Sequence, residues 1–303
     1  MTANSGSPGS GRSYGVERVC RAWDYPRSTF YQKRAQNSKT ESGRECKPQK
    51  RGPKTRLSDE QLLALIRADL ASSPFTGEGH RKVWARLKFG AGIKVGRNRV
   101  LRIMRANNLL SPRRPRRDAN QHQGEIITAA PDLMWGADGT KVFTVKEGWA
   151  WVFAAVDHFN AECVGQHTCK KGDRFAALEP VAGAVKEHFG SLAEEAARGL
   201  QLRIDNGGPY LSEHFQNQII FWGITPSFAF IEQPETNGVV ERFFRTLKEQ
   251  IIYGRVYETV EDLRAAVDKF VGLYNAEWRI ERLGFLSPKQ ARESFLTGLA
   301  KCA

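Results

Sequence analysis

The sequence lacks the long apolar segment and the leader peptide that membrane-spanning or exported proteins carry. No stretch approaches the roughly 18 uninterrupted apolar residues that a bilayer crossing needs. The first twelve residues are rich in Ser and Gly rather than basic and then apolar, unlike a signal peptide. At 303 residues, 41% hydrophobic and 10% aromatic, the chain can build at least one substantial core. We therefore expect a soluble, intracellular protein of two or three compact units, with no membrane partner.

Paired cysteines and nucleotide-binding loops are also missing. The cysteines are odd in number and widely spaced, with no CxxC pair, at positions Cys20, Cys46, Cys163, Cys169 and Cys302. This pattern predicts reduced thiols and argues against a disulfide framework or a cysteine zinc site. We find no Walker loop, no GxGxxG motif and no internal repeat.

What the sequence does have is a strong asymmetry of charge. Residues 1–120 hold 27 Lys and Arg against 9 Asp and Glu, a net charge of +18, whereas the rest of the chain carries −5. The first part is typical of a domain that binds a polyanion, and the second is compatible with a metal-binding catalytic domain. Composition alone leaves open a globular domain with a basic tail that binds ribosomes or acidic lipid.

The basic part contains several short helical patterns. Residues 13–35 predict a small helix pair, and residues 36–56 are polar, basic and interrupted by Pro and Gly, as in a linker. Ser58 with Gln61 three positions later predicts a helix start, and this helix should end near residues 72–74. We therefore assign residues 1–56 to a basic arm with a small helical segment and linker.

Residues 57–110 predict a helix-turn-helix domain. A helix over 80–89, a Gly-rich turn at 90–92 and a basic helix from Arg97 follow one another, with Ile103 and Met104 facing inward. The alternative is a three-helix bundle with a solvated Arg face, but the basic surroundings favour DNA binding. The candidate DNA-contacting residues are Arg81, Arg97, Arg99, Arg102 and Arg105, and, in a basic linker over 111–130, Arg113, Arg114, Arg116 and Arg117.

From residue 131 the periodicity changes to that of a mixed α/β domain. Strands over 133–145, 149–156 and 163–168 are followed by helices over 173–188, 212–222 and 237–252 with strands at 200–204 and 223–227 between them. The order βββαβαβα predicts a mixed sheet covered by helices. We assign this core to residues 131–275, with a last helix over 260–274 and a C-terminal tail over 276–303.

Three carboxylates in this core occupy positions that can bring them together. Asp138 lies in the first strand, Asp205 directly follows an apolar strand, and Glu241 lies in the first turn of the helix over 237–252. Taken singly, each Asp is more often a turn or cap residue, and Glu241 could simply pair with Arg245. Together they can hold two divalent cations about 3.5–4 Å apart, as phosphodiester chemistry uses them. Oxygen ligands favour Mg²⁺ or Mn²⁺.

The spacing and neighbours of these carboxylates resemble one known family. Between Asp205 and Glu241 lie 35 residues, and the blocks around them read W-x-x-D-x-T from Trp135, D-x-G-x-x-Y from Asp205, and Asn237, Glu241, Phe244, Leu247 and Lys248. Tyr274-Asn275, Leu283-Gly284 and Ser287-Pro288 match a closing motif, and residues 81–83 and 97–109 match a helix-turn-helix segment. The chain thus resembles the integrase-type transposases of bacterial insertion sequences, specifically the second-frame product of the two-frame group.

This resemblance implies an RNase H-like catalytic core preceded by all-α DNA-binding segments. It implies a DDE-type polynucleotidyl transferase that binds terminal inverted repeats and target DNA, cleaves 3′ ends and transfers strands with two Mg²⁺ or Mn²⁺ ions. Lys248, with Arg245 beside it, would contact the DNA. It further implies a homo-oligomer on DNA, an upstream-frame partner protein and a place in the bacterial cytoplasm at the nucleoid. The chain departs from the family pattern at Trp278 to Glu281, Thr236 and His80.

Two other functions are compatible with the sequence. The first is a catalytically silent DNA-binding regulator or domesticated remnant, which would keep the helix-turn-helix and lose catalysis. The second is a structure-specific nuclease with the same core. The complete triad with Lys248 favours an active enzyme over the remnant, and the basic arms favour transposition over the nuclease.

Overall fold

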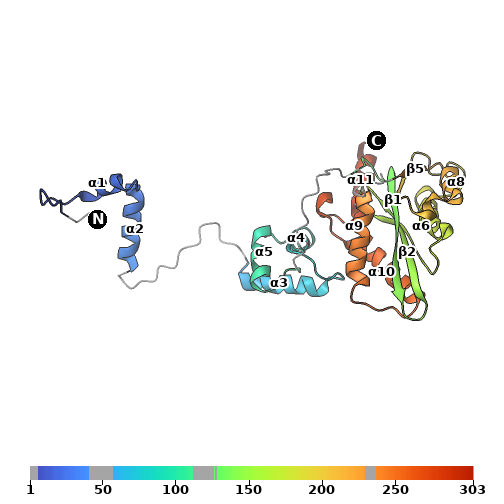
Figure 1. Cartoon of the computed structure of the whole chain (residues 1–303), viewed down its shortest axis with the longest axis horizontal. Helices are drawn as coiled ribbons and strands as arrows, with labels where there is room; N and C mark the ends of the chain where they lie inside the picture. The colour runs from blue at the N-terminus through green and yellow to red at the C-terminus, as the bar shows by residue number, and fades with distance from the viewer. Residues whose placement is uncertain (1–5, 41–56, 112–125, 127, 229–236, 303) are drawn as a thin grey trace. The chain divides into compact units, whose positions relative to one another are not determined.

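The computed structural model describes residues 6–40, 57–111, 126, 128–228 and 237–302 (Figure 1). The chain forms two compact units, residues 1–56 and residues 57–303. In the first unit, helix α1 (Gly15–Ala22) is followed by helix α2 (Arg27–Thr40). Helix α2 extends beyond the predicted end at residue 35, because neither Pro nor Gly interrupts the chain between Arg27 and Thr40. Within the described residues, no helix has both the length and the apolar content that a bilayer crossing requires.

The second unit begins with the predicted all-α segment. Helix α3 (Asp59–Ser72) starts at a capping box, in which Ser58 Oγ accepts from the Gln61 N–H at 3.2 Å and Gln61 Oε1 accepts from the Ser58 N–H at 2.9 Å. Helix α4 (His80–Ala85) continues into a π-helical turn, η1 (Arg86–Gly90), and helix α5 (Arg97–Ala106) follows. The three helices share a small core whose buried members are Leu62, Ile66, Val83, Leu87, Val100, Ile103 and Met104.

The rest of the unit is built on a five-stranded mixed sheet. Strands β1 (Met134–Thr144), β2 (Gly148–Asp157) and β3 (Cys163–Cys169) are antiparallel, whereas β4 (Gln201–Ile204) and β5 (Thr225–Phe228) run parallel to β1. The strand order is β3-β2-β1-β4-β5. All five strands lie at or within two residues of the predicted ranges, because their alternating apolar residues are bounded by turn residues.

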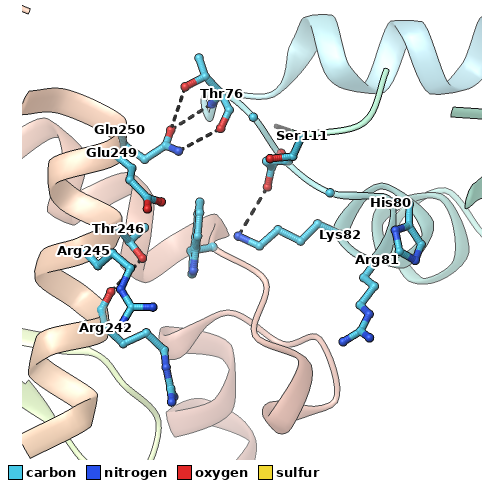
Figure 2. Close-up of a pocket in the computed structure, with 14 residues that line it drawn as sticks. Thr76, His80, Arg81, Lys82, Ser111, Arg242, Arg245, Thr246, Glu249 and Gln250 are labelled. Carbon is cyan, nitrogen blue, oxygen red and sulfur yellow. Dashed lines mark hydrogen bonds and ion pairs between the residues drawn. The ribbon is translucent and has the colours of Figure 1, made fainter. Parts of the chain in front are cut away.

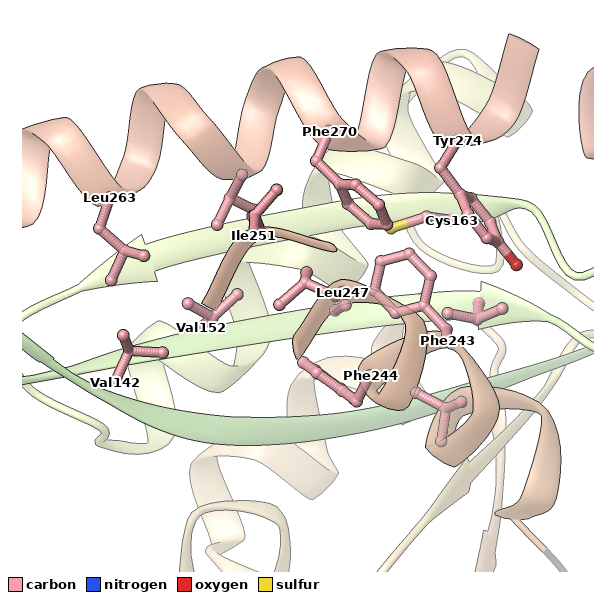
Figure 3. Packing of buried hydrophobic residues seen from close by; sticks show 14 of the residues in the cluster. Val142, Val152, Cys163, Phe243, Phe244, Leu247, Ile251, Leu263, Phe270 and Tyr274 are labelled. Carbon is pink, nitrogen blue, oxygen red and sulfur yellow. The ribbon is translucent and has the colours of Figure 1, made fainter. Parts of the chain in front are cut away.

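Helices cover both faces of the sheet, and the alternation of strand side chains separates two cores. One face, with Trp135 and Ala137 of β1, packs against α6 (Arg174–Phe189) and α8 (Glu213–Phe221), which the short helix α7 (Gly208–Leu211) precedes. The other face, with Val142, packs against α9 (Gly238–Leu247), its π-helical continuation η3 (Lys248–Ile252) and α10 (Val260–Glu277) (Figure 3). The predicted α/β class, a mixed sheet covered by helices and preceded by all-α segments, is confirmed.

Beyond α10 the chain remains ordered into a short 3₁₀ turn, η4 (Glu281–Leu283), and a further helix, α11 (Pro288–Cys302). The sequence carries the signal for α11. Ser287 and Gln290 form a reciprocal capping pair, at 3.3 and 3.2 Å, and Pro288 occupies the first helical position. Arg292 of α11 then reaches back to the core, where it forms ion pairs with Asp132, Asp157 and Glu162.

The packing of α9 predicts a large difference between two phenylalanines. Phe243 is 1% exposed and its ring contacts Phe244, Phe270 and Tyr274, whereas Phe143 is 56% exposed. Phe243→Ala should lower the free energy of unfolding by about 3–5 kcal/mol because it leaves a cavity. Phe143→Ala, the control, should cost less than about 1 kcal/mol. Urea unfolding followed by circular dichroism measures both, and equal losses would contradict the assigned core.

Candidate active site

Asp138 lies in the central strand β1, on the face that α9 covers. Side chains alternate along a strand, so Asp138 shares a face with Gly136 and Val142. Val142 belongs to the core shared with α9, and Gly136 lies directly beneath Asn237, the residue that precedes α9. Asp138 is half-buried and one of its carboxylate oxygens accepts a hydrogen bond from the Gly139 N–H at 2.7 Å.

Asp205 directly follows β4, the strand that pairs in parallel with β1. The β1–β4 register pairs Gly136 with Arg203, and two residues farther along each chain are Asp138 and Asp205. Paired residues of parallel strands point to the same side of a sheet, so the two carboxylates belong to one face at one end of β4. Asp205 is exposed, and its carboxylate accepts from the Gly207 N–H at 2.9 Å, which turns the chain away from the strand.

Glu241 approaches from α9. The helix buries Val240, Phe243 and Leu247 against the sheet, and this leaves Glu241 exposed in the first helical turn. The helix runs in the same direction as β1, because its start lies over Gly136 and the segment that follows it pairs Tyr257 with Thr144. Glu241 is therefore carried along β1 toward the level of Asp138.

The three charges act on one another. Burial is the largest cause that raises the pKa of the Asp138 carboxyl, and together with the negative charges of Asp205 and Glu241 it brings this pKa to about 6. The Gly139 N–H and the positive charge of Lys248 act in the opposite direction on this pKa. Yet among the residues that the structure describes, no three His, Cys, Asp or Glu side chains stand close enough to hold one metal ion. The carboxylates share an electrostatic neighbourhood without forming a closed ligand shell.

The candidate DNA-contacting arginines do not form one solvated face. Arg99, whose side chain is 19% exposed, donates to Asp59 and to the Leu57 carbonyl and so ties α5 to the start of α3. Arg102 also pairs with Asp59, at 2.7 Å. Arg81 and Arg97 pair with Glu281, whereas Arg105 and Arg245 are exposed. The linker arginines Arg113, Arg114, Arg116 and Arg117 lie outside the described residues.

A cavity of about 840 Å³ lies between the segment from Thr76 to Lys82 and the exposed side of α9 (Figure 2). Thr76 and Gln250 join its walls by two reciprocal hydrogen bonds of 2.9 Å. Arg245 lines the cavity, as does Arg242, which the sequence did not single out. Glu241 lies one helical turn before Arg245 on α9, so Arg245 stands between Glu241 and this cavity.

The segment in which the sequence departs from the family pattern contributes to the same region. Lys82 lies over the ring of Trp278 and 3.7 Å from Glu78, and burial lowers the pKa of its ammonium group to about 6. Glu281 pairs with Arg81 at 2.5 Å. Trp278 and Glu281 therefore contact the helix-turn-helix segment, an arrangement that sequence reasoning could not supply because the partners are about 200 residues apart.

Asp157, another acidic residue of the core, has a structural role. Asp157 is fully buried, accepts from the backbone N–H groups of Asp132 and Phe159, and pairs with Arg292 at 3.2 Å. Burial raises the pKa of Asp157 to about 6. Asp157 therefore holds the turn at the end of β2. Glu232, Glu235 and Thr236 lie outside the described residues.

Known proteins resemble this chain in both of its functional parts. Residues 58–117 match an HTH-like domain and residues 222–288 match an integrase core domain, a range that includes Glu241 and Lys248 and begins after Asp138 and Asp205. Transposase InsD for insertion element IS2A/D/F/H/I/K from Escherichia coli is 26% identical over 260 residues, covering 82% of this chain and 84% of the relative.

Solved integrase structures are similar at lower sequence identity. The catalytic core domain of BIV integrase is 22% identical and covers 55% of this chain and 99% of its own, with a TM-score of 0.40. The HTLV-2 integrase catalytic core domain in complex with magnesium is 17% identical and covers 54% and 98%, with a TM-score of 0.35.

The raised pKa of Asp138 predicts that this residue destabilises the metal-free protein. An unfolded Asp ionises near pH 4 and the folded Asp138 near pH 6, so the cost of its charge is absent below pH 4 and complete above pH 6. With EDTA present, Asp138→Asn should raise the free energy of unfolding by about 1–3 kcal/mol at pH 8. The gain should shrink near pH 4.5. Urea unfolding measures it, and exposed Glu194→Gln serves as the control with little change at either pH. A loss of stability at pH 8 would show that the buried charge is compensated.

Proposed function

We infer that this chain, a homologue of insertion-element transposases with an integrase-type core, is a transposase that cleaves and joins DNA. The observation that carries this conclusion is that Asp205 and Glu241 lie close enough for their charges to act on the half-buried carboxyl of Asp138. This constellation occurs in a chain whose relatives, named transposases, align with 82% of it. The HTH-like match at residues 58–117 supports double-stranded DNA as the partner.

Asp138, Asp205 and Glu241 are the proposed catalytic and metal-binding residues. Their donor set fits Mg²⁺ or Mn²⁺, because carboxylate oxygens are the ligands these ions prefer. Two such ions, when bound, would activate the attacking hydroxyl and stabilise the leaving oxygen. The chain's own part is to present Asp138 without its proton, a state that the Gly139 N–H and Lys248 favour. Among the described residues the carboxylates do not form a three-ligand group, so their side chains would turn toward the ions on binding while α9 stays in place.

DNA would lie along the basic side of this site. Arg245 follows Glu241 by one turn on the exposed side of α9, and half-buried Lys248 begins η3 one turn farther along. Arg81 and Arg97 can exchange Glu281 for phosphate because exposed ion pairs contribute only about 0–1 kcal/mol. Arg102, Arg105 and the linker arginines complete the proposed contacts. The proposed ligands are terminal inverted repeats and target DNA.

We also propose that the protein forms a homo-oligomer on DNA, acts with an upstream-frame partner and is located at the bacterial nucleoid. Its proposed domains are residues 1–56, 57–110, 111–130, 131–275 and 276–303.

One observation favours a second candidate function. Because the described carboxylates form no three-ligand group, a DNA-binding regulator without catalysis is the alternative. The two candidates differ in whether the joining of DNA ends depends on divalent metal.

The proposed catalytic role predicts that removing any one of the three carboxylates impairs strand joining. Asp205→Asn and Glu241→Gln should each lower Mg²⁺-dependent strand joining at least about 100-fold, roughly 2.7 kcal/mol of transition-state stabilisation. DNA affinity should remain, since neither residue is a proposed phosphate contact. Gel assays with labelled element ends measure joining, and Glu194→Gln is the charge-matched control. Wild-type levels in either variant would refute the metal account, and DNA binding without any metal-dependent joining by the wild type would favour the regulator.

The arginines of α5 predict two separable effects. Arg105→Ala should weaken DNA binding and reduce the slope of log affinity against log salt by about 0.9, as expected for one lost phosphate contact. Arg99→Ala should instead lower the melting temperature, because it removes the donor to the Leu57 carbonyl and one of the two arginines that pair with Asp59. Fluorescence anisotropy at several salt concentrations and thermal unfolding measure the two effects. If both variants lost the same affinity with no change in stability, the structural role of Arg99 would be wrong.

A further inference from the structure

Asn237 stands at the N-cap of α9 but is not used as a cap. Asparagine at this position commonly accepts a hydrogen bond from the first-turn N–H groups. In the described structure its side chain makes no such bond, and instead Nδ2 donates to the Ala137 carbonyl of β1, at a long 3.4 Å. The residue is only 5% exposed. The side chain therefore links the start of the helix that carries Glu241 to the strand that carries Asp138.

Gly136 makes room for this link. A Cβ atom built at Gly136 would lie 2.5 Å from Asn237 Oδ1 and 3.0 Å from His158 Nε2. Carbon and oxygen atoms do not approach within 2.5 Å without a bond, so any larger residue would push Asn237 away. The backbone at Gly136 is an ordinary strand, without positive φ, so space rather than conformation demands glycine here.

The contact between Asn237 and Gly136 also determines where Glu241 lies relative to Asp138. Four helical residues, from Asn237 to Glu241, rise about 6 Å. Two strand residues, from Gly136 to Asp138, rise about 6.6–6.8 Å. Helix and strand run in the same direction, so the rise along α9 nearly equals the rise along β1. When Asn237 contacts Gly136, Glu241 is therefore placed over Asp138.

We propose that Asn237 and Gly136 form a seat for the first turn of α9 that sets the separation of Glu241 from Asp138. Both are positioning residues, since neither is a proposed ligand or nucleophile. The expected effect on DNA joining rests on the proposed function. The expected effect on the structure of α9 does not depend on that function. This seat would fix the position of the Glu241 carboxylate, which the identity of the three acidic residues does not determine.

The test uses the full chain with Gly136→Ala. The added methyl group should displace Asn237 and loosen the first turn of α9. Mg²⁺ demands near-ideal octahedral geometry, so Mg²⁺-dependent joining should fall at least about 10-fold. Joining with Mn²⁺ should fall distinctly less, and DNA affinity should stay within about two-fold, because the phosphate contacts are untouched. The diagnostic quantity is the Mn²⁺-to-Mg²⁺ activity ratio, which a general loss of stability would not raise.

Gly172→Ala is the matched control. A Cβ at Gly172 would meet the Trp151 ring at 2.2 Å, a comparable clash away from α9, so this variant should lose stability without a change in the metal ratio. Asn237→Ser is the second variant, for use if Gly136→Ala folds poorly. It should also raise the ratio, and in its background Gly136→Ala should add less than about a two-fold effect. Additive losses, or a ratio that matches that of Gly172→Ala, would overturn the seat.

A measurement independent of catalysis separates the seat from the proposed function. Amide hydrogen exchange in the second turn of α9, whose N–H groups bond to the carbonyls of the first turn, should be faster in Gly136→Ala than in the wild type and unchanged in Gly172→Ala. Unchanged exchange in Gly136→Ala refutes the seat whether or not the protein joins DNA. Faster exchange in a protein that never joins DNA with metal supports the seat as a structural contact and refutes the proposed function alone.

Discussion

The parallel pairing of β1 with β4 is the contact on which the rest of the site depends. It involves only three residue pairs, from Met134–Gln201 to Gly136–Arg203. These pairs lie in the middle of the sheet, where α6 and α8 cover one face and α9 and α10 the other. Because side chains alternate along a strand, this register, continued one residue past the end of β4, places Asp138 and Asp205 on the same side. A slip of one residue would send one carboxylate into the opposite apolar core.

The third carboxylate depends on a different kind of packing. Helix α9 is held by its apolar side, so the position of Glu241 follows from how Phe243 and Leu247 fill the core and from what lies under the first turn. The site thereby gathers like charges around a half-buried acid, an arrangement that opposes folding until cations are bound. The large apolar core beneath α9 and α10 offsets this cost.

Some basic residues of this chain form ion pairs within the fold and others are exposed, a difference that the net charge does not show. Arg99 and Arg292 are used inside the fold, where they join α5 to α3 and α11 to the core. Arg105 and Arg245 remain exposed and available to a polyanion. Arg81 and Arg97 are intermediate cases, because both form exposed ion pairs with a single acid, Glu281. The high positive charge of the first 120 residues therefore overstates the number of arginines open to DNA.

The sequence by itself determined the elements, because their signals are local: the Ser58 and Gln61 pair starts α3, and alternating apolar residues define β1 and β2. It also singled out the three carboxylates, through their spacing and family motifs. Only the tertiary structure decided that Asn237 leans on Gly136, that Arg292 anchors α11, and that Trp278 covers Lys82. Those contacts join residues about 100 to 200 positions apart. A local pattern records which face of a helix or strand is apolar, but the partner that fills a given space is settled only when the elements pack together.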